Sequence, residues 1–137
     1  MSFHQAVADI RARMAANWAA TPIAYANEPF APPEPPSPWV FFEVVEGASM
    51  LRGIGKPGER LYIYTGLIQA HVYVPAGSGE TLARQYADAI GEIFRAKQFG
   101  STVRTNVPNV DAGGPGSDDG LWWRVTAAID FDFFYHG

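Results

Sequence analysis

Residues 60–97, RLYIYTGLIQAHVYVPAGSGETLARQYADAIGEIFRAK, carry the patterns of a strand, a turn and a helix in direct succession. Alternate positions of 62–74 are apolar, which predicts one long strand with a buried face and a candidate bend at Gly66. Glycine and proline at 75–79 predict a turn. The apolar residues that follow recur every three or four positions, so we expect a helix over about 80–97.

Apolar periodicity predicts one more helix and two more main strands. Apolar residues of 3–18 recur at helical spacing, with Ser2 as the N-cap. The stretch WVFFEVVE at 39–46 is apolar at both parities, which predicts a strand inside the sheet that is covered on both faces. Residues 121–133 alternate between an apolar face and a partly wet face, which predicts a closing strand after a short one at 101–105.

The order of these elements predicts the fold class. It suits an α+β fold with an antiparallel or mixed β-sheet and two α-helices packed on one face. A chain of 137 residues is expected to bury one core, so residues 1–137 are predicted to form a single domain.

Three segments are predicted to be surface connections. Residues 22–38 hold seven of the eleven prolines, which predicts a proline-rich connection with at most a short edge strand at 23–25. Residues 47–59 hold four glycines and predict a protruding arm between two strands. The loop 106–120 is rich in Gly, Pro, Asn and Asp, and we expect it to be the most mobile segment.

Composition excludes several classes of function. The chain has no cysteine, so disulfides, thiolate metal sites and cysteine nucleophiles are excluded. Its formal net charge is −4 and its bases are scattered, which disfavours binding to nucleic-acid phosphates. No secretory signal or membrane-spanning run is visible, so we expect synthesis as a soluble protein in the cytoplasm.

Motifs for cofactors and metals lack their required context. Gly53, Gly55 and Gly58 fit G-x-G-x-x-G, but they lead into a strand pattern rather than a helix, so an ordinary turn is favoured. None of the three histidines, His4, His71 and His136, shares a predicted helix face with a His, Asp or Glu three or four positions away, the spacing that would bring two metal ligands together. We therefore predict no cofactor and no metal.

Acidic residues offer two weak catalytic or metal hypotheses. Asp130 and Asp132 share a strand face, so paired-carboxylate chemistry is conceivable, although solubility and protection of a terminal strand explain them more simply. Asp111, Asp118 and Asp119 lie in a stretch without the calcium-loop pattern, which favours a solvated loop. Ser78 lies outside any nucleophile elbow, and no enzyme is predicted.

The adjacent Trp122 and Trp123 must point to opposite sides of one strand. The one outside the core layer is either packed beneath a loop of the same subunit or exposed as an anchor for a partner. Stacking of single-stranded nucleic acid is a third hypothesis, which the acidic balance disfavours.

The chain resembles a family of small phage tail terminator proteins, also found in prophages and gene transfer agents. The resemblance covers roughly residues 3–133 and lies in FAPPEPPSPWVFFEVVEG, in VYVPAGSG and in the helix LARQYADAIGEIFRAKQF, with Ala87 to Ile90 and Phe94-Arg95 at matching positions. It implies a tail-terminator-like fold and a structural virion protein without catalytic residues.

The resemblance also implies partners. Such a protein forms a homo-oligomeric ring, a hexamer in the related siphophage terminator, at the tail-head junction of the virion. It caps the tail tube protein, stops tube growth and receives the head-tail connector or stopper protein, while DNA passes through the lumen without sequence-specific binding. The candidate interface residues are Met50, Leu51, Arg52, Lys56, Asp111, Asp118, Asp119 and Trp122.

Two alternatives remain open at this point. Another neck component, either a head-tail stopper or an adaptor, would need similar ring interfaces. A small-molecule-binding or hydrolytic α+β domain would use His71, Asp130 or Asp132.

Overall fold

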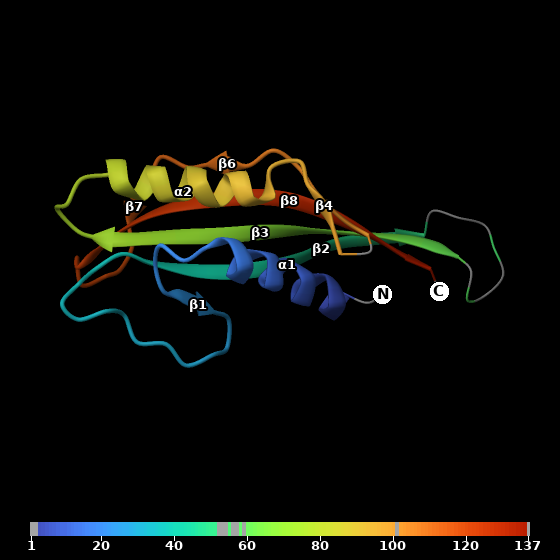
Figure 1. Ribbon diagram of the computed structural model, residues 1–137, viewed down its shortest axis with the longest axis horizontal. Coiled ribbons are helices and arrows are strands. Elements are labelled where there is room, and N and C mark those ends of the chain that lie inside the picture. Colours follow the sequence, from blue (N-terminus) through green and yellow to red (C-terminus); the bar gives the residue numbers. More distant parts are fainter. Residues whose placement is uncertain (1–2, 52–54, 56–57, 59, 101, 137) are drawn as a thin grey trace.

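Three long strands run side by side through the centre of the protein. They are β2 (Trp39–Leu51), β3 (Leu61–Pro75) and β8 (Trp122–His136), and β3 pairs antiparallel with both of the others. Two helices, α1 (Phe3–Asn17) and α2 (Thr81–Phe94), lie on one face of this sheet (Figure 1). The computed structural model describes residues 3–51, 55, 58, 60–100 and 102–136.

Five short strands complete a mixed sheet of eight strands. The main path is β1-β2-β3-β8-β5-β4, and β6 and β7 also pair with β8. Because two helices cover one face of a mixed sheet, the predicted α+β class is confirmed. The short strands are β1 (Ile23–Tyr25), β4 (Gln98–Phe99), β5 (Val103–Thr105), β6 (Asn109–Val110) and β7 (Gly114–Pro115).

The core lies between the helices and the sheet. Small alanines on α1 and α2 let the helix axes approach the strands, and large rings fill the remaining space. The predicted apolar alternation is confirmed for the second half of β3 and for β8, where every second side chain from Ile68 to Val74 and from Val125 to Phe133 is buried in the core. The core includes Ala6, Ile10, Met14, Val40, Phe42, Ile68, Ala70, Val72, Ala83, Ala87, Ile90, Phe94, Val125, Ala127, Ile129, Phe131 and Phe133.

Gly66 makes room for an aromatic ring instead of breaking its strand. β3 runs through Gly66 without interruption and pairs there with Phe131 of β8. A Cβ at Gly66 would lie 2.5 Å from Cζ of Phe131, so any side chain would collide with that ring. The irregularity lies in β2, between Glu46 and Ser49, where the Thr65 hydroxyl accepts the Ala48 N–H and donates to the Ala48 carbonyl.

Helix α2 ends three residues before the predicted end at Lys97. The hydroxyl of the buried Thr105 donates a hydrogen bond to the Phe94 carbonyl and accepts one from the Lys97 N–H at 2.9 Å. Ala96 takes a positive φ of 48°, which turns the chain out of the helix. A tertiary contact from β5 therefore fixes this end.

The prediction of an edge strand at 23–25 is confirmed, and β1 pairs parallel with β2 at residues 40–42. A parallel pair needs a long crossover between its strands, and the proline-rich connection supplies it. Beyond Phe42, the outer edge of β2 has no partner strand among the described residues.

The segment before β8 is more regular than predicted. We expected an irregular loop at 106–120, but β6 and β7 pair with β8 there, and β5 pairs with it further along. These three short strands line one edge of β8, while β3 occupies the other. β8 is therefore an inner strand, and the interpretation of its acids as edge protection is wrong.

Two burial predictions also need correction. β2 was expected to be covered on both faces, but Val45 is 44% exposed, because the helices cover only one side of the sheet. Leu121 was placed on the buried face of the closing strand, yet it precedes β8 and is 54% exposed.

Candidate interaction surface

The face of the sheet opposite the helices carries a row of bonded side chains. The strand register places Phe41, His71 and Thr126 next to one another across β2, β3 and β8. Nδ1 of His71 lies 2.7 Å from the Thr126 hydroxyl oxygen, and Nε2 lies 2.9 Å from Oε1 of Glu43. The Phe41 ring stacks on the imidazole at 5.8 Å between centroids. This row ties the three central strands together.

A hydroxyl, an imidazole and a carboxylate in contact have the order of groups used in nucleophilic catalysis. Here Thr126 is only 9% exposed, and its backbone N–H and C=O both bond to Asp111. A substrate carbonyl has little access to this hydroxyl, so we assign the row a structural role. The sequence pointed to His71 but missed Glu43 and Thr126, because only the strand register brings them together.

The structure does not bring His71 together with the two acids of β8. Asp130 lies four residues from Thr126 along the strand, about 13 Å at the usual rise per residue. Asp132 pairs with Arg104, whose Nε lies 3.3 Å from Oδ1, while Asp130 is exposed. Both acids line an open depression of about 430 Å³ with Glu46, Val45 and Leu67.

Trp122 is packed inside an aromatic cluster on the open face. Trp39 stacks on Tyr73 at 4.2 Å, meets Trp122 edge-on at 5.9 Å and contacts Phe30 at 5.0 Å. Only 8% of Trp122 is exposed, and Gly116 of the neighbouring segment lies so close that a Cβ there would come within 3.2 Å of the Trp122 Cβ. Trp122 is thus packed within its own subunit instead of being exposed, and its part in an interface stays a prediction.

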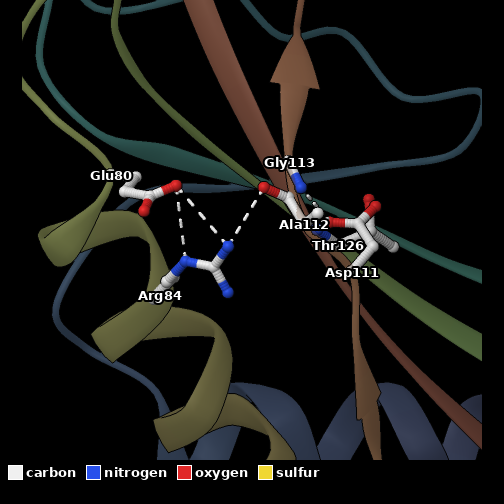
Figure 2. Close-up of polar contacts among 6 residues, drawn as sticks. All are labelled: Glu80, Arg84, Asp111, Ala112, Gly113 and Thr126. Atoms are coloured by element: carbon white, nitrogen blue, oxygen red, sulfur yellow. Dashed lines mark hydrogen bonds and ion pairs between the residues drawn. The ribbon is translucent and has the colours of Figure 1, made fainter.

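Helix α2 and β8 both hold the middle of the 106–120 segment (Figure 2). Arg84 lies beside Glu80 of its own helix and donates to the Ala112 carbonyl at 3.1 Å. Oδ1 of Asp111 accepts hydrogen bonds from the backbone N–H groups of Gly113 and Thr126, both at 3.0 Å. The carboxylate thus bridges the gap between β6 and β7, so one oxygen of this predicted interface residue is already engaged.

The tip of the same segment carries the two remaining predicted acids. Oδ1 of Asp119 accepts the Ser117 hydroxyl and the Leu121 N–H, and these bonds lower the pKa of Asp119. Asp118 is exposed, and its side chain makes no hydrogen bond or ion pair with the described residues. Of the predicted acidic candidates, Asp118 is the most available to a partner.

The predicted arm begins as regular strand. The backbones of Met50 and Leu51 belong to β2 and pair with Ile63 and Tyr62 of β3. The other two candidates in the arm, Arg52 and Lys56, lie outside the described residues, as do Gly53 of the glycine pattern and the helix N-cap Ser2.

The described part of the chain contains neither a candidate metal site nor a candidate membrane-spanning helix. Its His, Asp and Glu side chains include no group of three or more that could hold a metal ion. No helix there is long and apolar enough to cross a membrane.

A family model for phage tail terminator proteins matches residues 5–131, nearly the whole chain. The chain belongs to the phage tail terminator family. This tail terminator is also similar to a solved protein structure, with a TM-score of 0.70 and 24% sequence identity. The match covers 100% of this chain and 99% of the chain in that structure. That likeness supports the fold alone. A search of curated proteins found no match.

Family membership explains why the described surface favours contacts over chemistry. Tail terminators are structural proteins of the phage tail, and their role implies contact with other tail and head proteins. In this tail terminator Glu43, His71 and Thr126 of the open face bond to one another, whereas several large apolar side chains of the described chain are exposed. Those side chains are Val45, Leu82, Val107 and Leu121.

Proposed function

We propose that this protein assembles into a ring, a hexamer, that caps the tail tube, stops its polymerisation and provides the docking surface for the head-side connector. The observation that carries the proposal is the family match over residues 5–131, which leaves little of the chain for another activity. The protein works as a non-enzymatic structural component at the tail-head junction, and DNA passes through the ring lumen without sequence-specific contacts.

The shape of the chain supports two different contact surfaces. The three central strands run along the long axis of the molecule, with the end of β2 and the start of β3 at one end and the start of β8 at the other (Figure 1). A ring built from such subunits presents unlike ends to the tube and to the head. Residues 47–59 and 106–120 are therefore the contact candidates, with Asp118 as the most accessible described acid.

Electrostatics supports passage of DNA through the ring. The chain carries a net charge of −4, so an acidic lumen would repel phosphates and let DNA slide. Strong phosphate binding would instead hold the DNA during ejection.

Imaging of particles made without this protein tests the proposal. We expect overlong tails without heads, and restoration of normal tail length when the wild-type chain is supplied in trans. Tails of normal length that lack heads would contradict a terminator and indicate a head-tail stopper or an adaptor.

A further inference from the structure

Two segments on opposite sides of the sheet differ in charge. Residues 22–51, which include β1 and β2, contain four acids and no Lys or Arg. Residues 95–106, which include β4 and β5, contain three bases and no acid. We call these the acidic flank and the basic flank. β1 of the acidic flank and β4 of the basic flank end the sheet path on opposite sides.

Each flank has charge that its own subunit leaves uncompensated. Glu34 and Glu46 on the acidic flank are exposed and have no ion pair among the described residues. On the basic flank, Lys97 is exposed and equally unpaired there. Arg95 and Arg104 bind Glu92 and Asp132 in pairs exposed enough to rearrange at little cost.

Apolar side chains accompany the charges on both flanks. Val45 precedes Glu46 and is 44% exposed, while Val107 follows the basic flank and is 61% exposed. The edge of β2 beyond Phe42 also has no partner strand among the described residues. Protein interfaces combine apolar contact with complementary charge in this way.

We propose that the acidic flank of one copy docks against the basic flank of the next copy. This inference rests on the proposed ring and names the contact that holds it. The two flanks are different surfaces of one chain, so each contact is head-to-tail, and repetition by rotation closes a ring without leaving a free flank. Complementary charge also disfavours pairing of two acidic or two basic flanks, which excludes a two-fold dimer through either surface.

Charge reversal tests this contact. Glu46→Lys and Lys97→Glu should each weaken ring formation on isolated tail tubes, by roughly five-fold or more at each interface. The double variant should recover most of the loss. Asp88→Lys is the matched control, because Asp88 is exposed on α2 and outside both flanks. Thermal unfolding of every variant verifies that the fold is retained.

A zero-length carbodiimide cross-linker gives a second readout in the wild-type ring. It joins carboxylates to amines in direct contact, and we expect cross-links between Lys97 of one copy and Glu34 or Glu46 of another, detected in mixtures of isotopically light and heavy protein. The inference is overturned if rings form without these cross-links, or if the double variant forms rings no better than the single variants. Either result leaves the proposed function intact. If the wild-type protein neither forms rings nor caps tubes, the proposed function itself fails.

Discussion

The two faces of the central sheet are formed by the same three strands, yet their side chains differ in kind. Positions toward the helices, such as Ile68 and Val72, are fully buried and apolar. The alternate positions, such as Glu43 and His71, carry polar groups bonded to one another. One face supplies the hydrophobic free energy of folding, and the other fixes strand register through specific bonds while staying accessible to partners.

Truncation of an aromatic side chain on the buried face should show the difference between the two faces most strongly. Phe131→Ala should lower the free energy of unfolding by about 3–5 kcal/mol, because it opens a cavity in the core. Phe134→Ala, on the half-exposed face of the same strand, is the control and should have a much smaller effect. Urea unfolding followed by tryptophan fluorescence measures both, and equal losses would contradict the assignment of the faces.

A methyl group added at Gly66 should have the next largest effect. Gly66→Ala places a Cβ against the Phe131 ring and should destabilise the fold by about 1–3 kcal/mol. Gly114→Ala is the control, since a Cβ there meets open space. Combining Gly66→Ala with Phe131→Leu should give less than the sum of the two single losses, and strict additivity would argue against this contact.

Removal of one bond from the open face should have a smaller effect. Thr126→Val keeps the side-chain shape but removes the hydroxyl bound to His71, so we expect a loss of about 1 kcal/mol. Thr81→Val serves as control, because that hydroxyl makes no bond among the described residues. If both variants unfold at the same urea concentration, the row across the three strands contributes nothing to stability.

The smallest effect concerns the exposed Asp119. Its pKa is lowered in the folded protein, so its stabilising contribution is present above its ordinary pKa of about 3.9 and is lost as pH falls through the folded value. Asp119→Asn should therefore lower the stability slightly near neutrality and flatten the acid side of the stability curve below about pH 4, where the wild type has already lost this contribution. If stability below about pH 4 depends on pH equally in the variant and the wild type, Ser117 and Leu121 do not stabilise the charged Asp119 carboxylate.

Local patterns predicted the parts of the fold that depend on nearby residues. The alternation around Val72 located the long strand, and the helical spacing of Leu82, Tyr86 and Ile90 located the second helix. The end of α2 was missed because Thr105, eleven residues away, determines it. The strands β6 and β7 were missed for a similar reason, since Gly and Pro in 106–120 favour a loop until β8 supplies partners.

The candidate site was less predictable than the fold. Trp122 was a strong aromatic signal, but it packs against Trp39, which is distant in sequence. Asp111 was identified by charge alone, whereas its role in bridging β6 and β7 depends on the position of Thr126. The flanks became visible only when the sheet order placed two oppositely charged segments on different sides.

The position of β8 has a consequence for synthesis. This strand lies inside the sheet, bonded to β3 on one side and to β5, β6 and β7 on the other, yet it follows every other described element along the chain. A ribosome must therefore translate all the other elements before the sheet can close. A nascent or truncated chain lacks the inner strand that joins β3 to β5, β6 and β7, so the sheet can form only after translation has passed through β8.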